Sequence, residues 1–385
     1  MTSFLVFIIL VLVGIAVWQL TKIFDLTQIG GTPSSDEIAN DKDNSVNGYL
    51  MFAFVGFIYV FTIYSLYAWG DLVLGTPASE HGPDYDNLMF ISLAIIFFVQ
   101  TITQFLLHYF AFKYRGKEGQ KALYFADNNK LEAVWTIIPV IVLAGLIMYG
   151  LFTWNNIMFV DEEDKQDAIV IELYAKQFGW EARYAGDDKT LGKANVRLIE
   201  GINTLGVDLA DPAAQDDKVV TELHLPVGKK VIFKMRSQEV LHSAYMPHFR
   251  AQMNCVPGMI TQFSFTPTVT TADMRSDAAI MAKVDKINKI RTENSKKIVA
   301  DGGTALDPYT FDYLLLCNKI CGASHYNMQM KIVVDTPADF KAWLNEKPTL
   351  AQQWKEANAP APVAAPVSSP AVAVDTTKVL AQVIK

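Results

Sequence analysis

The chain has 385 residues, of which 51% are hydrophobic and only 19% are charged. This composition is apolar for a soluble protein, and most of the apolar excess lies before residue 155. The formal net charge of −7 argues against a nucleic-acid partner. Three cysteines allow at most one disulfide, which excludes a disulfide-stapled scaffold.

Four apolar stretches near the start of the chain predict membrane-spanning helices, because a span needs about 20 mostly apolar residues. They are residues 4–20, 49–74, 88–112 and 133–152. Buried core helices are the alternative, but four nearly uncharged stretches within 155 residues favour spans. The first stretch has no basic n-region and no clear small-x-small cleavage site, so we interpret it as a retained span rather than a signal peptide.

The distribution of lysine and arginine predicts the orientation of these spans. The loop at residues 113–130 is rich in basic residues and is expected on the cytoplasmic side. The loop at residues 75–87 has no lysine or arginine and carries three acidic residues, so it is expected outside. Everything after residue 152 then lies in the periplasm. The sequence thus predicts a multi-pass protein of the bacterial inner membrane with a periplasmic C-terminal domain.

The pattern after residue 152 predicts an all-β domain. Short runs of β-branched and aromatic residues alternate there with turn signals. The predicted strands are residues 168–184, 218–226, 228–236, 259–265, 311–316 and 328–335. The second and third runs predict a hairpin around Val227 and Gly228. At least six strands at this spacing favour a sandwich or a barrel.

Two insertions and a tail complete the predicted organisation. Residues 270–306 place apolar side chains at helical spacing with basic residues between them. Such a helix could lie on a membrane surface, although packing on its own domain is the preferred interpretation. The C-terminal stretch is rich in Pro and Ala and cannot bury a core. The predicted parts are 1–87 (two extra N-terminal helices with their loops), 88–154 (a helix hairpin), 155–345 (the exported domain, with insertions near 186–216 and 270–306) and 346–385 (the tail).

A short segment near the C-terminal end, "CNKICGASHYNM" at residues 317–328, concentrates potential metal ligands. Thiolates and thioethers are soft ligands, and imidazole suits copper and zinc. Structural zinc sites are closed by four Cys or His ligands, whereas methionine is a poor zinc ligand. A methionine beside cysteine and histidine therefore points to copper in an electron-transfer site.

A second histidine is expected from elsewhere in the chain. His242 is the best candidate, because it follows a predicted strand and opens a loop that contains Pro and Gly. His248, six residues further on, is the competitor. His224 lies inside a strand pattern and is expected to be a packed histidine. His81 and His108 belong to the membrane region and are set aside.

These residues carry a resemblance to a known family. The pattern C-x3-C-x3-H-x2-M, preceded by V-L-H-S-x3-P and then P-G, resembles subunit II of the haem-copper cytochrome c oxidases. "NNKLEAVWTIIP" resembles the start of the second helix of the family's hairpin, and "KQFGWEARY" resembles its aromatic-rich strand. The resemblance covers roughly residues 88–345 apart from the insertions. It implies a helix hairpin that carries an exported, cupredoxin-like Greek-key β-domain with a binuclear CuA centre.

The resemblance also implies roles for individual residues in binding two copper ions. Cys317 and Cys321 would bridge both ions as thiolates. The remaining implied ligands are His242, His325, Met328 as a weak ligand, and the backbone carbonyl of Lys319. The family has Glu at the position of Lys319, where its side chain binds magnesium at the interface with subunit I. Lysine cannot do this, so the magnesium site is predicted to be altered or absent.

The resemblance also implies roles in electron and proton transfer for residues outside the ligand set. Phe178 stands where the family's first Trp accepts electrons, and Trp180 matches its second Trp, although either could be a core aromatic. Glu239 replaces the Asp of the family's D-V-L-H-S docking segment. Glu132 matches a Glu that feeds protons into the K pathway of subunit I, and the alternative is a helix N-terminal carboxylate favoured by the dipole. Cys255 matches no ligand and is expected to be buried.

The resemblance implies an electron-transfer subunit of a cytochrome c oxidase. Electrons would pass from a c-type cytochrome to the copper centre and on to subunit I, which carries the haems and CuB and couples O2 reduction to proton pumping. Subunit III is a further expected partner. The absence of C-x-x-C-H predicts that the donor is a separate protein. The alternatives are a quinol oxidase subunit II, which would lack the copper ligands, nitrous-oxide reductase, a membrane-anchored copper assembly protein, or a structural disulfide between the two cysteines.

Overall fold

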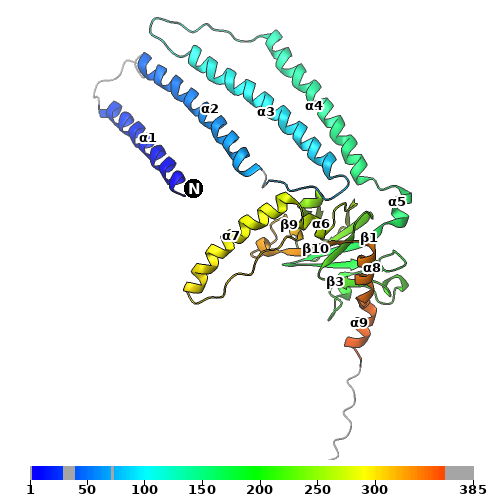
Figure 1. The fold of residues 1–385 in the computed structure, drawn as a ribbon. Helices are drawn as coiled ribbons and strands as arrows, with labels where there is room; N and C mark the ends of the chain where they lie inside the picture. The colour runs from blue at the N-terminus through cyan, green and yellow to red at the C-terminus, as the bar shows by residue number, and fades with distance from the viewer. Residues whose placement is uncertain (1, 29–39, 71–72, 360–385) are drawn as a thin grey trace, which may run out of the picture. The chain divides into compact units, whose positions relative to one another are not determined.

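The structure is a computed structural model that describes residues 2–28, 40–70 and 73–359. The chain divides into two compact units (Figure 1). One unit comprises Met1–Gly70 and Ile91–Leu143, and the other comprises Asp71–Phe90 and Ala144–Lys385. The first unit is helical, and the second contains all of the described β-strands.

The N-terminal part forms long apolar helices, as predicted. They are α1 (Thr2–Gln28), α2 (Asp41–Trp69), α3 (Gly82–Lys113) and α4 (Asn129–Met158). Within the described residues, α2, α3 and α4 are long and apolar enough to cross a membrane, while the apolar part of α1, Phe7–Thr21, is shorter. Their apolar side chains are largely exposed, as expected of surfaces that face lipid.

Helices α2 and α3 pack closely at one end. Gly48 makes this possible, because a Cβ atom there would lie only 2.5 Å from Cδ2 of Phe112. The Phe112 ring also lies 5.0 Å from the Tyr49 ring, and Arg115 Nε donates a hydrogen bond to Ser45 Oγ at 3.2 Å. One of the two extra helices is therefore packed directly on the predicted hairpin.

The second unit is built on two five-stranded sheets, ordered β3-β2-β1-β5-β8 and β4-β10-β9-β6-β7. Side chains from both sheets share one core, in which the rings of Phe233, Phe265, Phe249 and Tyr313 follow one another at 5.3, 4.9 and 4.8 Å. This is the sandwich that the strand pattern predicts. The strands are β1 (Ile169–Lys176), β2 (Gly179–Tyr184), β3 (Lys218–Val220), β4 (Leu223–Pro226), β5 (Val231–Ser237), β6 (His242–Met246), β7 (Ala251–Cys255), β8 (Thr261–Phe265), β9 (Tyr313–Cys317) and β10 (Gln329–Asp335).

The strand pairing corrects one prediction. The hairpin expected around Val227 and Gly228 is wrong, because β4 pairs in parallel with β10 and β5 pairs in parallel with β1. The chain changes sheets at this point, and Gly228 has a φ of 74°, which favours glycine. The long run at residues 168–184 is itself a hairpin of β1 and β2. Strands β6 and β7 carry polar residues and were not predicted.

Both insertions and the start of the tail contain more structure than predicted. Leu205, Val207 and Ala214, in the segment expected to be a polar loop, form a small core with Tyr174. The predicted amphipathic helix is α7 (Ala278–Ala300), which follows the short helix α6 (Thr271–Arg275). Helices α8 (Pro337–Glu346) and α9 (Leu350–Ala357) were not predicted, and α9 lies in the segment expected to be tail. A capping box at Thr349 starts α9.

The segment before α3 is part of the β-domain. Ala78 N donates to His248 O at 2.7 Å, and Ser79 Oγ donates to Phe249 O at 2.7 Å. Both Ala78 and Ser79 are buried. This loop therefore lies on the same side of the membrane as the β-domain, as its lack of basic residues predicts.

Candidate metal centre

Neighbouring strands bring the potential metal ligands together. His242 opens β6 and Cys317 ends β9, and these strands pair with Ala244 opposite Cys317. The loop after β9 carries the other ligand candidates and returns into β10. Its ends are fixed by hydrogen bonds from Cys317 N to Met328 O at 3.1 Å and from Asn318 N to Ser243 O at 3.0 Å.

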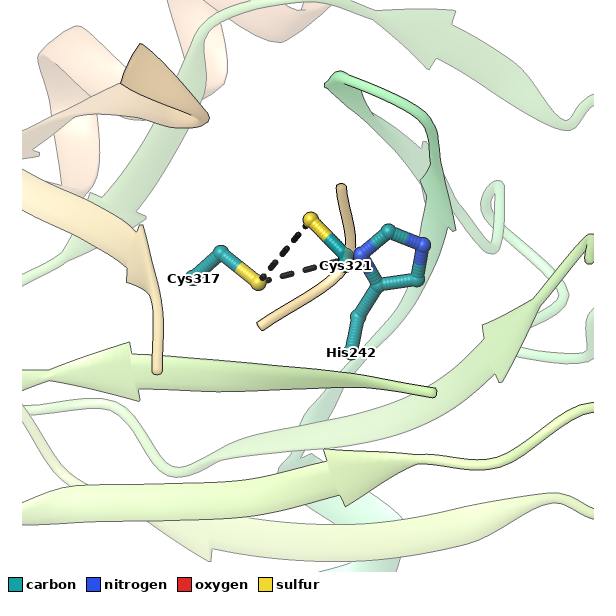
Figure 2. Close-up of side chains that lie close together, drawn as sticks. All are labelled: His242, Cys317 and Cys321. Carbon is teal, nitrogen blue, oxygen red and sulfur yellow. Dashed lines mark hydrogen bonds between the residues drawn. The ribbon is translucent and has the colours of Figure 1, made fainter. Parts of the chain in front are cut away.

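The two thiol sulfurs lie at the middle of the cluster, 3.9 Å apart. Figure 2 shows Cys317 and Cys321 pointing toward each other, with the His242 ring beside them. The ligand atoms of these three residues all lie within 4.8 Å of one another. The structure thus brings together the groups that the resemblance implies. The remaining distances are 3.7 Å from Cys317 Sγ to His242 Nδ1, 3.2 Å from Cys317 Sγ to Lys319 O, 3.6 Å from Cys321 Sγ to His325 Nδ1 and 3.7 Å from Cys321 Sγ to Met328 Sδ.

The geometry suits a shared soft metal ion. Both cysteines are free thiols, and a separation of 3.9 Å is far beyond a disulfide bond of about 2.05 Å. Two thiolates that each bind one ion at about 2.3 Å can lie no more than about 4.6 Å apart, which this pair satisfies. Two sulfurs with imidazole and thioether groups around them form a donor set that prefers copper.

Burial sets the protonation of these groups. It raises the pKa of the Cys321 thiol to about 11, and the neighbouring Cys317 adds to this effect. A Cys321 thiolate in this environment is therefore stable only beside a positive charge, which a metal ion supplies. Burial lowers the pKa of His242, so the imidazole is neutral and has a lone pair to offer. Its Nε2 atom is buried without a hydrogen-bond partner among the described residues.

The other histidine candidates are engaged elsewhere. The His248 ring is half-buried and packs against the aromatic core, 5.1 Å from the Phe311 ring, so the competitor of His242 is engaged away from the cysteines. His224 Nδ1 lies 2.5 Å from Asp335 Oδ2 and its ring stacks on Trp343, as expected for a packed histidine. Cys255 is fully buried, and burial raises the pKa of its thiol to about 12.

The turn between β1 and β2 covers the ligand loop. Gln177 Nε2 donates a hydrogen bond to Cys321 O, and Glu239 Oε1 accepts one from Gln177 N at 2.6 Å. Phe178 lies against Gly322, where a Cβ atom would come within 2.9 Å of the ring. The sequence indicated Phe178 and Glu239 but missed Gln177 and Gly322, because nothing local marks a contact between such distant segments.

The residues predicted to act in electron transfer, magnesium binding and proton transfer lie beside the cluster, on the protein surface or in the membrane part. Phe178 is 38% exposed, whereas Trp180 is only 4% exposed and its ring lies 6.2 Å from the His242 ring. The Lys319 side chain is exposed, although its carbonyl faces Cys317. Glu132 is exposed in the first turn of α4.

The fold and the cluster define a membrane-anchored protein with an exported β-domain whose cluster could hold a metal ion. Residues 76–152 match the family described as cytochrome c oxidase subunit II, transmembrane domain, and residues 169–273 match its periplasmic domain. The alternative cytochrome c oxidase subunit 2 of Bradyrhizobium diazoefficiens is 33% identical over 278 residues, which cover 72% of this chain and 84% of that protein. Cytochrome c oxidase subunit 2 of Thermostichus vulcanus is 25% identical over 304 residues, covering 72% and 80%.

The chain belongs to the cytochrome c oxidase subunit II family. It is therefore a subunit of a haem-copper oxidase, with a transmembrane part followed by a periplasmic domain. Copper binding is a property of this family, and the cluster of His242, Cys317 and Cys321 could hold a metal ion in this chain.

Proposed function

We propose that this chain is the electron-transfer subunit of a cytochrome c oxidase and that its cluster holds two copper ions. A c-type cytochrome would supply electrons, which pass to haem in subunit I for O2 reduction coupled to proton pumping. The observation that carries this proposal is the pair of free thiols 3.9 Å apart with one imidazole nitrogen beside each sulfur. Each of two ions could thus be held by one imidazole together with the thiolates of Cys317 and Cys321.

The surrounding chain would hold these ligands still. Copper bound by this set supplies a carrier for one electron at a time. His242 and Cys317 sit on paired strands, and both ends of the ligand loop are tied by backbone hydrogen bonds. Gln177 fixes the loop at Cys321. Ligands that cannot move keep the geometry constant between oxidation states, which favours rapid electron transfer.

Electrons are proposed to arrive through Phe178. Its ring is partly exposed and lies on Gly322, next to Cys321 in the chain. Glu239 is exposed beside it and would add negative charge to the surface that meets the cytochrome. Trp180 is buried next to His242, so it would act from within the domain rather than touch the donor.

Two further proposals concern subunit I. Glu132, in the first turn of α4, would deliver protons to it from the cytoplasmic side. The exposed side chain of Lys319 provides no carboxylate, so we propose that this subunit does not bind magnesium. Magnesium bound to this subunit in a metal analysis of the purified oxidase would contradict that proposal. Subunit III is proposed as an additional partner.

The test of the copper proposal is an EPR spectrum of the purified full-length protein after loading with copper. Two coppers per chain, a multi-line mixed-valence signal and absorption in the near infrared are expected. Cys317→Ser should abolish the multi-line signal, because the ions would lose a shared thiolate. His248→Ala is the matched control and should retain the signal, since this histidine packs on Phe311 away from the cluster.

A four-line signal or a single copper per chain would reject the binuclear centre. That result would instead favour a membrane-anchored copper-binding assembly protein. Failure to bind copper would favour a role like that of a quinol oxidase subunit II, although the intact set of ligands argues against it.

A further inference from the structure

Helix α7 concentrates positive charge in an otherwise acidic chain. It contains six basic and two acidic side chains, while the whole chain has a net charge of −7. The helix lies outside the residues that match the family, which are 76–152 and 169–273.

One side of α7 is used by the domain. Ile280 is buried in the core at the start of the helix. Further along, Asn288 exchanges two hydrogen bonds with the backbone of Tyr309, at 3.1 and 2.7 Å. Arg291 Nη1 donates to Asp307 O at 2.7 Å. The segment that follows α7 thus runs back along this side, which explains why the helix is stable as it projects from the domain (Figure 1).

A second side of α7 is exposed and basic, and we call it the lysine strip. Its members recur at intervals of three, four and seven residues, so they share one side of the helix. All are exposed, including the apolar member, Ile290, at 62%. Among the described residues none of the strip's lysines forms an ion pair. Glu293, which is three residues from Ile290 and four from Lys297, borders the strip, and its carboxylate is paired with Lys296 at 2.9 Å. The strip consists of Lys283, Lys286, Ile290 and Lys297.

The strip begins beside the segment that joins two membrane helices. A surface cavity of about 390 Å³ is lined by Lys283 and Lys286 on one side and by Leu74, Gly75 and Thr76 on the other. Thr76 Oγ1 also lies 3.5 Å from Asp277 Oδ2, at the N-cap of α7. Residues 74–76 follow α2 and precede α3, so Lys283 and Lys286 lie beside the segment that connects two predicted membrane helices.

We propose that the lysine strip binds the headgroups of anionic phospholipids on the periplasmic surface of the membrane. Unpaired lysines are attracted to such a surface, and their long stems allow the ammonium groups to reach phosphates. An exposed Ile290 between lysines is unfavourable in water but suits the boundary between headgroups and acyl chains. A lipid surface is favoured over an acidic protein because the strip starts beside the membrane exits of the chain itself.

The test is hydrogen–deuterium exchange of the full-length protein in nanodiscs. One set contains phosphatidylcholine alone, and the other also contains phosphatidylglycerol. Amide exchange in α7 is expected to slow by about fivefold or more in the anionic set, the factor that a single lysine contact with an anionic surface provides. The triple variant K283Q/K286Q/K297Q should lose this difference. The matched variant K289Q/K296Q, which changes lysines on another side of the helix, should retain it.

Several outcomes would overturn the proposal. Exchange in α7 that is equal in both lipid sets would do so, as would a triple variant that keeps the difference. Inorganic phosphate that slows exchange in phosphatidylcholine nanodiscs would indicate an isolated anion site instead of a lipid surface. Exchange in β1 and β9 reports whether the triple variant folds. If it does not, Lys286→Glu provides the same test with a single change.

Discussion

Gly322 offers a quantitative test of how the ligand loop is held. Its φ of +140° is a conformation that residues with a side chain rarely adopt. A Cβ atom there would lie 2.8 Å from Gln177 Nε2 and 2.9 Å from Cε1 of Phe178. In Gly322→Ala the backbone strain costs about 1–3 kcal/mol. Displacement of the packed neighbours costs about 1–3 kcal/mol more. We therefore expect a total loss of about 2–6 kcal/mol, most of it in the ligand loop.

Thermal unfolding of the full-length protein measures this loss. For a domain of this size, about 2 kcal/mol lowers Tm by about 4 °C or more. The EPR spectrum of the copper-loaded variant should also change, because the displaced Gln177 side chain no longer holds Cys321 O. Loss of this contact is expected to move the Cys321 sulfur relative to the Cys317 sulfur.

Two matched glycines separate the contributions. At Gly179 a Cβ atom would meet no neighbour closer than 4.0 Å, and the φ of this residue is ordinary, so Gly179→Ala should be nearly neutral. Gly258 has a φ of +77° with open space around it, so Gly258→Ala should cost only the backbone strain, about 1–2 kcal/mol. Equal Tm values and equal spectra for Gly322→Ala and Gly179→Ala would show that Gly322 does not hold the ligand loop. A larger loss of stability in Gly258→Ala than in Gly322→Ala would show the same.

Three further variants each test a single contact or group. Arg183→Met should cost about 3–5 kcal/mol in thermal unfolding, because it leaves the buried carboxylate of Asp217 without the guanidinium that lies 2.7 Å away, while Glu172 keeps its ion pair with Arg236. A loss below about 1 kcal/mol, roughly that of an exposed pair, would contradict this. Phe178→Ala should slow oxidation of a reduced c-type cytochrome by about tenfold or more with the copper signal intact, and an unchanged rate would remove Phe178 from the docking surface. Glu132→Gln should lower oxidase turnover without altering the copper signal, and equal turnover in the variant would leave only a structural role for this carboxylate.

Local chemistry explains which features the sequence could predict. Membrane helices are recognisable by their uninterrupted apolar length, and three of the predicted spans fall on helices that meet this criterion. The cysteines, His325 and Met328 are close in sequence, so their spacing already limits how far apart they can lie. His242 was preferred to His248 because it follows a predicted strand and was expected to open a loop, whereas in the structure it opens strand β6. The structure places His242 Nδ1 at 3.7 Å from Cys317 Sγ.

Long-range packing explains what the sequence could not predict. The strands on either side of Gly228 were recognised, but their partners, β10 and β1, lie far away in sequence and in different sheets. A hairpin is the usual interpretation of two strands joined by a short turn. Here β4 and β5 instead pair with different sheets, and both bury their side chains in the core that the two sheets share. In the segment at 186–216, the buried Leu205, Val207 and Ala214 are too few to alter a polar composition.

Lys319 shows how the chain can depart from the family at a position between two ligands. Its carbonyl lies 3.2 Å from Cys317 Sγ, whereas its side chain is exposed. The backbone and the side chain of this residue therefore face different surroundings. A carbonyl ligand places no demand on the side chain beyond the loop conformation, which the hydrogen bonds of Asn318 N and Cys317 N maintain. A side chain other than a carboxylate at this position is therefore compatible with the geometry of the sulfur cluster, as the proposed absence of a magnesium site requires.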